Sequence, residues 1–304
     1  MAAKRNLIVG LIILFLFLGI GFLAAVAYFS GGAGYAETED GVFAIGSKVA
    51  IVDIAGVITS SGEAVRQLKK YADDGSVKAV ILRIESPGGA VAPSQEIYDA
   101  VLKAKKKKGV VASMGAVAAS GGYYIACAAD SIVANPGSLT GSIGVIFEFP
   151  VFGELFKKIG IKTEVVKSGE LKDVGSPTPP MTEHERRMLQ SVINDTYDQF
   201  VEAVVKSRKM ERSRVLALAD GSVFTGRQAK ANGLVDQLGN FEDAVRLAGK
   251  MGGIEGEPRT VKEKKYRRRT VFDLVGEELF GRGGSIPEEW RDMLAPGLKY
   301  LYKM

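Results

Sequence analysis

The chain has 304 residues, of which 46% are hydrophobic and 25% are charged, and it carries a net charge of +5. This composition excludes a disordered chain, and the length suits one large domain or two smaller ones. The basic excess comes largely from short lysine and arginine runs, which are typical of solvated surface, so no nucleic-acid partner is predicted. The single cysteine, Cys127, excludes an intrachain disulfide. Neither a metal-binding cluster nor a nucleotide loop stands out, so no cofactor is predicted.

An apolar run without a charge, residues 7–29, follows a short head that carries Lys4 and Arg5. The run is long enough to span a bilayer as a helix, and a positive head is expected to stay in the cytoplasm. We therefore expect residues 1–29 to form a cytoplasmic head and a single-pass transmembrane anchor. The rest of the chain would then lie on the extracytoplasmic side of the inner (plasma) membrane. The triplet Ala25-Val26-Ala27 leaves cleavage as a signal peptide open.

Shifts in composition divide the rest of the chain into three parts. Residues 30–46 are rich in glycine and acidic side chains and predict a flexible linker. Residues 47–254 predict the folded domain. Residues 255–304 predict a basic linker and then a short amphipathic tail, suited to docking on the body of the protein or on a partner. The apolar residues of this tail are Val271, Phe272, Leu274, Val275, Leu279 and Phe280.

Strands and helices alternate through the first half of the folded domain. β-Branched apolar runs predict the strands, and apolar residues at helical spacing predict the helices. Short connections between alternating elements favour parallel strands with helical crossovers. On the longest predicted helix, residues 183–206, a stripe of apolar residues predicts that this face packs against the core. The predicted strands are 49–54, 79–84, 109–114 and 131–134, and the predicted helices are 63–71, 96–107, 120–129 and 183–206.

Ser120 lies among small residues and is followed directly by two glycines. Hydrolysis at a serine needs a nucleophile at an exposed turn, a base, and N–H groups that face the developing oxyanion. The two glycines allow a tight turn and a close approach of substrate. Ser120 is therefore a candidate nucleophile, although a serine that only caps a helix fits the local pattern equally well.

A second glycine motif, Ser86-Pro87-Gly88-Gly89, follows the strand predicted at 79–84. Taken alone, such a sequence after a strand is a common turn. Together with the Ser120 segment, this motif becomes a candidate for the oxyanion hole. One N–H from Gly88 or Gly89 and the N–H of Gly121 would make a two-donor oxyanion hole.

The residue that would accept the serine proton is inferred by excluding other residue types. His184 is the only histidine and lies in the charged first turn of the longest predicted helix, so it is expected to be solvated. A serine–histidine–acid triad is therefore disfavoured. Lysine is the remaining common partner of a serine nucleophile, provided that burial makes it neutral. Lys167 and Lys172 both follow an apolar run, and the residues alone do not choose between them.

Four motifs carry a resemblance to a known family. They are Ser86-Pro87-Gly88-Gly89, the segment 119–124, the segment 140–145, and Lys167-Ser168-Gly169 with Lys172-Asp173. In these motifs the chain resembles the signal peptide peptidase A family over residues 49–247, and the predicted anchor fits this family. The resemblance implies an α/β fold of the Clp/crotonase type, built from repeated β-β-α units and preceded by one transmembrane helix.

The same resemblance implies a Ser/Lys dyad, with Ser120 as nucleophile, Lys172 as general base and Ser142 orienting the lysine amine. Lys167 is not the base in the family pattern. The implied function is a membrane-anchored endopeptidase that degrades residual signal peptides and other apolar peptides. Family members assemble into homo-oligomeric rings or domes, and a neighbouring subunit often completes each site. The alternatives are a membrane peptidase that cleaves a specific membrane protein and a non-catalytic peptide-binding scaffold.

Overall fold

The computed structural model describes residues 47–178, 180–263 and 297–301. The predicted anchor (residues 1–29), the predicted linker (residues 30–46) and the apolar tail residues 271–280 lie outside the described residues. Among the helices that are described, none is long and apolar enough to cross a membrane.

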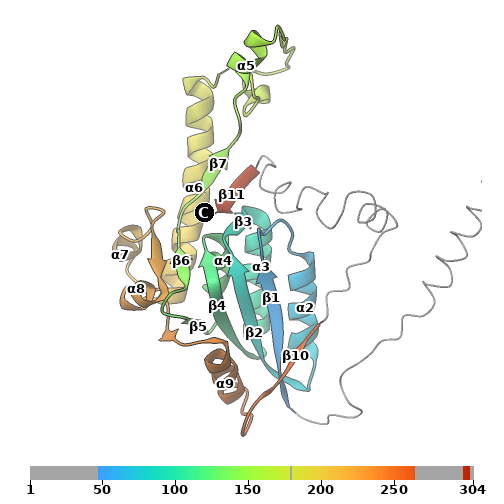
Figure 1. Cartoon of the computed structure of the whole chain (residues 1–304), viewed down its shortest axis with the longest axis vertical. Coiled ribbons are helices and arrows are strands. Elements are labelled where there is room, and N and C mark those ends of the chain that lie inside the picture. The colour runs from blue at the N-terminus through green and yellow to red at the C-terminus, as the bar shows by residue number, and fades with distance from the viewer. Residues whose placement is uncertain (1–46, 179, 264–296, 302–304) are drawn as a thin grey trace, which may run out of the picture. The chain divides into compact units, whose positions relative to one another are not determined.

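A mostly parallel β-sheet forms the centre of the folded domain (Figure 1). Along the sheet the strand order is β10-β1-β2-β4-β5-β9, with all neighbours parallel. A short extension is made by β6, parallel to β4, and β8, antiparallel to β6. The strands are β1 Lys48–Ala55, β2 Val77–Ser86, β4 Gly109–Ala119, β5 Ser131–Ala134, β6 Leu139–Gly141, β8 Val223–Thr225, β9 Gln237–Leu238 and β10 Arg259–Lys262.

Helices cover both faces of this sheet. Successive side chains of a strand point to opposite faces, so Ala50 and Val52 of β1 pack towards α2, α3 and α4, whereas Val49 and Ile51 pack towards α9. Burial on both faces explains why the central strands are almost continuously apolar. The helices are α2 Gly62–Asp73, α3 Val91–Lys105, α4 Gly121–Ala126 and α9 Phe241–Met251.

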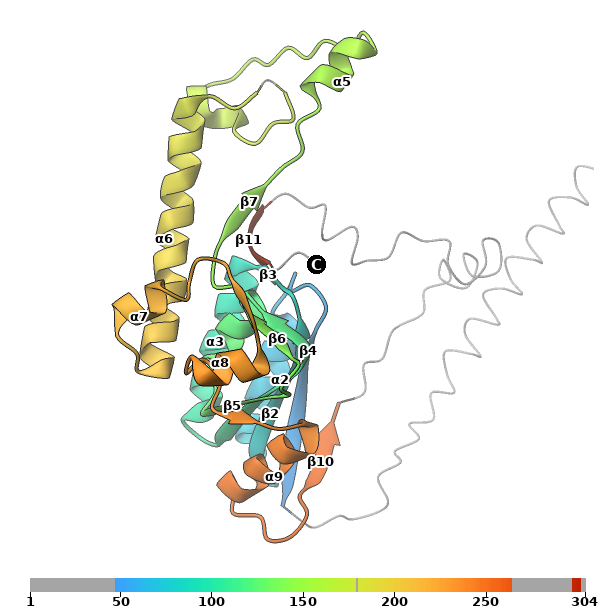
Figure 2. The ribbon, with the colours of Figure 1, turned by 60° about the vertical axis from the view of Figure 1, so that its left-hand side comes forward.

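After β6 the chain leaves the sheet along β7 (Ile146–Glu148) to α5 (Gly153–Lys158) and returns along α6 (Glu183–Arg208), as Figure 2 shows. A 3₁₀ turn at Glu170–Asp173 precedes α6. The second half of α6 packs on the core through buried residues such as Phe200 and Val204, but its first half does not, and Val192 is 41% exposed. The core packing predicted for the whole stripe is therefore correct only for the second half. The shorter helices α7 (Arg212–Leu216) and α8 (Gly226–Ala231) follow.

A second, three-stranded sheet has the order β3-β11-β7. Its strands β3 (Gly88–Ala90) and β11 (Gly297–Leu301) lie more than 200 residues apart in the sequence. In Figure 1, β11 lies between β3 and β7, and it is antiparallel to both.

The predicted α/β class with helical crossovers is confirmed, but several boundaries differ from expectation. Strand β4, for example, continues to Ala119, five residues beyond its predicted end. Helix α3 begins at Val91, five residues before its predicted start, because β3 leads directly into it. Residues 259–262, expected in a basic linker, form β10 and pair with β1. This pairing satisfies the backbone groups that the edge of β1 would otherwise leave open, which is why a polar segment becomes a strand there.

An ion pair joins the end of α6 to the segment before β9. Arg208 donates two hydrogen bonds to Asp236, of 2.6 and 2.9 Å, and Asp236 also accepts the N–H of Ile132 at 2.8 Å. Burial alone raises the pKa of Asp236, but the bonds from Arg208 outweigh it and hold the pKa below its usual range. Nearby, the Tyr123 hydroxyl of α4 donates to the Leu234 carbonyl at 2.9 Å. The Tyr123 bond ties α4 to the same segment that holds α6.

Replacing Asp236 with Asn is expected to lower the free energy of unfolding by about 2 kcal/mol at neutral pH, because Arg208 keeps its charge in a largely buried site while Asp236 is partly exposed. A carboxyl whose pKa is depressed on folding stabilises above its unfolded pKa of about 3.9 and stops doing so as the pH falls through the folded value. Urea unfolding of both proteins across pH 7 to 3 should therefore show the difference shrinking in acid. An equal difference at every pH would contradict the assignment.

Candidate active site

Ser120 occupies a strained turn between β4 and α4. Its backbone has φ 51° and ψ −115°, a region that residues other than glycine seldom adopt. The turn is fixed from both sides, because the Ser120 N–H donates to the Gly141 carbonyl and the Tyr124 N–H donates to the Ser120 carbonyl, both at 2.8 Å. Such a conformation costs about 1–3 kcal/mol and is concentrated at functional sites.

The hydroxyl of Ser120 is buried and has no hydrogen-bond partner among the described residues. Ser120 holds the N-cap position of α4, but its side chain makes no capping hydrogen bond, which disfavours the interpretation of Ser120 as only a helix cap. A buried hydroxyl without a partner costs about 1–3 kcal/mol. The fold thus holds the Ser120 hydroxyl in an unfavourable state that a hydrogen bond from another group would relieve.

Ser142 lies next to this turn. The register of β4 and β6 pairs Ala119 with Gly141, so the residue after each strand falls at the same edge of the sheet. Ser142 is also in the left-handed region, with φ 49°, and its N–H donates to the Ser222 carbonyl at 2.8 Å. The structure therefore brings the predicted nucleophile and its predicted supporting serine together, each just beyond a strand end.

The three glycines that were predicted to form the oxyanion hole also lie close together. A Cβ atom on Gly121 would lie 3.2 Å from the Gly89 nitrogen and 3.3 Å from the Gly88 Cα, so the two backbones approach closely. A Cβ atom on Gly89 would lie 2.2 Å from the Ile58 carbonyl oxygen. The Gly88 N–H donates to the Ser86 hydroxyl at 3.1 Å. Of the two alternatives for the first donor, Gly88 is thus already engaged.

The edge of β3 carries a paired strand in this structure. In the register of β11 with β3, Leu301 faces Gly88 and Tyr300 faces Gly89, while Lys299 also faces Ile146 of β7. The strand β11 also contacts α4, the helix that begins after Ser120. The edges of β3 and β7 therefore accept an extended strand between them, close to the Ser120 turn.

The predicted base, Lys172, does not bond to the Ser120 hydroxyl in the described chain. It is exposed in the 3₁₀ turn before α6. Lys167 donates to Asp173 at 2.6 Å, and this hydrogen bond raises the pKa of Lys167, which disfavours it as a base. His184 is about half exposed and lies 3.2 Å from the Glu170 carboxylate, as expected for a solvated histidine. Among the described residues, Ser120 and the three glycines therefore lie together, and neither candidate lysine bonds to the Ser120 hydroxyl.

Glu85 has a structural role that its sequence pattern does not reveal. Its carboxylate accepts the N–H groups of Ala116 at 2.9 Å and Val117 at 3.2 Å, at the point where the register between β2 and β4 shifts. The carboxylate takes the place of β2 as hydrogen-bond partner of these two N–H groups, so β4 can continue up to the Ser120 turn. An acidic residue before a Ser-Pro-Gly-Gly turn carries no signal of that role.

The chain matches known proteins along most of the folded domain. The model of peptidase family S49 matches residues 102–255, and that of Clp protease matches residues 47–136. The "Putative signal peptide peptidase SppA" of Enterococcus faecium is 39% identical over 244 residues, which is 76% of this chain and 67% of the relative. Protease 4 of Haemophilus influenzae is 41% identical over 212 residues, 66% of this chain and 34% of that protein. The chloroplastic serine protease SPPA of Arabidopsis thaliana is 36% identical over 191 residues, 62% of this chain and 27% of that protein.

These matches include both segments that build the site. The S49 match covers about half of the chain and contains the Ser120 turn, and the Clp match contains the β3 glycine motif and the same turn. A serine at a tight turn beside closely approaching backbone N–H groups suits a serine hydrolase. The chain therefore belongs to peptidase family S49 and is a serine peptidase.

Proposed function

We propose that Ser120 is the nucleophile of this peptidase. The observation that carries the proposal is its buried hydroxyl, which has no partner among the described residues and is held in a strained turn. In the reaction the Ser120 oxygen attacks the carbonyl carbon of the scissile peptide, and its proton passes to a base. The base then returns the proton to the leaving amine as the C–N bond breaks, and water releases the acyl group.

The oxyanion is assigned to the N–H groups of Gly89 and Gly121. Their backbones are in close approach, and the Gly88 N–H is engaged with Ser86. Donors held in this way need no rearrangement when negative charge develops on the substrate oxygen. Gly88 then acts through its conformation, with φ 105°, which turns the chain into β3.

Lys172 of a second copy is assigned as the base, oriented by Ser142. A lysine must be buried to be neutral near physiological pH, and Lys172 is exposed in a single chain. The segment around it also exposes many large apolar side chains, which favours cover by a neighbouring copy in a homo-oligomeric ring or dome. These side chains are Val151, Phe152, Leu155, Ile159, Ile161, Val165, Val166 and Val192.

The substrates are assigned as extended apolar peptides, above all residual signal peptides. The pairing of β11 with β3 and β7 supports a substrate that adds as a strand, because the same edges offer main-chain hydrogen bonds to any extended peptide. A substrate strand and β11 exclude each other from this position. The name of the Enterococcus faecium relative supports signal peptides over a specific membrane protein as substrate.

The proposal includes anchoring by residues 7–29 as a single transmembrane helix, with the peptidase domain on the extracytoplasmic side of the inner membrane. The uncharged run and its positive head support this topology. An anchored site meets peptides that remain in the bilayer. The order β2, β3, α3 also supports a fold built from the β-β-α units of the Clp/crotonase type.

Replacing Ser120 with Ala in the full chain is expected to lower peptide hydrolysis by about 10⁴-fold or more, because no other group supplies the attacking oxygen. Hydrolysis is measured on a synthetic signal peptide and on an intact membrane protein, with product analysis for both. Ser213→Ala, an exposed serine of α7, is the matched control and should retain activity. Activity that survives in Ser120→Ala would overturn the assignment of the nucleophile.

Replacing Lys172 with Met should abolish hydrolysis and preserve assembly, because Met fills a similar volume but cannot accept a proton. Lys167→Met should retain most of the activity. Rates of the native protein should rise with pH as the base loses its proton. The two variants are compared by rate and by size-exclusion chromatography, and a reversed result would show that Lys167 is the base.

Mixing the two inactive chains tests where the base comes from. If Lys172 acts on the Ser120 of another copy, co-assembly of Ser120→Ala and Lys172→Met chains should restore about one quarter of the sites by random pairing around a ring. The measurement is hydrolysis after the chains are refolded together at equal amounts. No recovery, with co-assembly shown by differently tagged chains, would place both residues of a working site in one chain.

A further inference from the structure

Ser86 is a fully buried serine at the end of β2, and it takes no part in the reaction steps proposed above. Its hydroxyl donates to the Gly56 carbonyl at 2.6 Å and accepts the Gly88 N–H at 3.1 Å. A third contact, to the Gly88 carbonyl, is 3.4 Å long, and that carbonyl already accepts the Ile58 N–H at 2.8 Å. A hydroxyl has one proton to donate, so the short contact with Gly56 takes it and the oxygen is left to accept from Gly88.

These two hydrogen bonds join the turn after β1 to the start of β3. Gly56 follows β1 directly, and Gly88 is the first residue of β3. The Gly56 N–H also donates to the Glu85 carbonyl at 3.0 Å, so the turn is held to the end of β2 at two points. Through the Ser86 hydroxyl, the same support extends to the peptide that carries the Gly88 N–H.

The direction of the Gly89 N–H follows from the peptide that joins Gly88 to Gly89. In a planar trans peptide the carbonyl and the N–H point in opposite directions. The Gly88 carbonyl points to the Ile58 N–H, so the Gly89 N–H points away from Ile58. A Cβ atom on Gly121 would lie 3.2 Å from the Gly89 nitrogen, so the second assigned donor is close to the first. Two successive peptides therefore decide where the Gly89 donor points, and each is held by one hydrogen bond.

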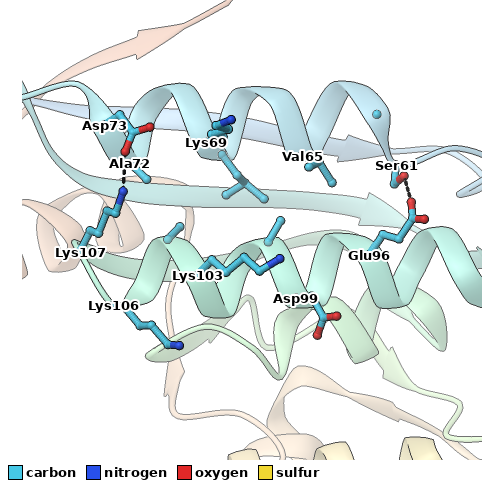
Figure 3. Close-up of a pocket in the computed structure, with 14 residues that line it drawn as sticks. Ser61, Val65, Lys69, Ala72, Asp73, Glu96, Asp99, Lys103, Lys106 and Lys107 are labelled. Carbon is cyan, nitrogen blue, oxygen red and sulfur yellow. Dashed lines mark hydrogen bonds and ion pairs between the residues drawn. The ribbon is translucent and has the colours of Figure 1, made fainter.

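Helix α3 supports the other end of β3. It begins at Val91, directly after β3, and two contacts join it and the turn after it to α2 and the residue before α2, Ser61 with Glu96 and Lys107 with Asp73 (Figure 3). The described residues that line the cavity of about 880 Å³ between these helices include neither the nucleophile nor an oxyanion glycine. The end of β3 is thus held by a helix, whereas the N–H at its start is held by a single hydroxyl.

We propose that Ser86 is a positioning residue for the oxyanion hole, an inference that rests on the proposed function. By holding the Gly88 N–H, its hydroxyl fixes the peptide from which the Gly89 N–H is directed. Without the hydroxyl, the Gly88 N–H loses its acceptor, and a glycine backbone rotates easily. A donor must lie about 2.7–3.1 Å from the oxyanion to stabilise it. A small rotation therefore weakens the contact with the transition state more than it weakens the binding of substrate.

Replacing Ser86 with Ala in the full chain tests this role. On the synthetic signal peptide, kcat should fall by about 10- to 100-fold while KM changes by less than about threefold, because the lost contact forms only in the transition state. Ser138→Ala is the matched control, since Ser138 is also buried and its hydroxyl also donates to a backbone carbonyl, that of Gly115 at 2.5 Å. This control should keep kcat within about threefold of the native value.

Measuring Ser120→Ala in the same assay separates the two proposals. Hydrolysis by Ser120→Ala would refute the nucleophile and the proposed function with it. An inactive Ser120→Ala together with a native kcat in Ser86→Ala would leave the nucleophile in place and refute only the positioning role.

A substrate with sulfur in place of the scissile carbonyl oxygen separates positioning from a general loss of structure. Sulfur accepts hydrogen bonds weakly, so a working oxyanion hole favours a peptide ester over the matching thionoester. The ratio of the two rates should fall by about tenfold in Ser86→Ala and stay at the native value in Ser138→Ala. Both substrates report on the same folded sites, so partial unfolding does not change this ratio.

Ser86→Thr keeps the hydroxyl and should keep the ester-to-thionoester ratio within about threefold of the native value. A ratio as low as that of Ser86→Ala would show that the volume at this position matters rather than the hydroxyl, and it would contradict the proposal. An unchanged ratio in Ser86→Ala would overturn it as well.

Discussion

The close approach of two backbones, at Gly121 and at Gly88–Gly89, is the constraint on which the site depends. Strand β3 is clamped by Ile58, which donates to the Gly88 carbonyl at 2.8 Å and accepts the Ala90 N–H at 2.7 Å. A side chain on Gly89 would collide with that clamp, and a Cβ atom on Gly121 would lie 2.8 Å from the Ser94 hydroxyl and 3.2 Å from the Gly89 nitrogen. Only glycine at both positions lets the two loops meet, and only that meeting can give two N–H donors to one oxygen.

The serine turn is maintained against local preference by the sheet beneath it. Ser120 and Ser142 are both left-handed, and each is held by one backbone hydrogen bond to the next segment, at Gly141 and at Ser222. The parallel pairing of β4 with β6 joins the two turns, so neither can relax alone. The same rigidity holds the Ser120 hydroxyl in a buried position without a partner. A strained and underbonded group is tolerated where the surrounding structure determines it completely.

The central strands could be predicted because parallel strands covered on both faces are apolar at nearly every position, as in β2 and β4. The edge strand β10 could not, since Arg259–Lys262 is mostly exposed and is held by backbone pairing with β1. The glycine motifs and Ser120 could be named as candidates, but their local pattern alone suited a common turn and a helix cap equally well. Glu85 could not be named, because its role arises only from a register shift between two strands. The exposed first half of α6 shows a related limit, since an apolar stripe does not reveal what covers it.

The separation of Lys172 from Ser120 in one chain has a chemical consequence under the proposed assignment. A lysine amine accepts a proton only in its neutral form, which an environment shielded from water favours. The described chain leaves Lys172 exposed and offers no such environment. Cover by a neighbouring copy would remove water from the amine and favour its neutral form. Burial of the apolar surface from Val151 to Val166 would supply the free energy for that cover. Assembly and activation of the base would then be one event, and a lone chain would be unable to cleave peptides.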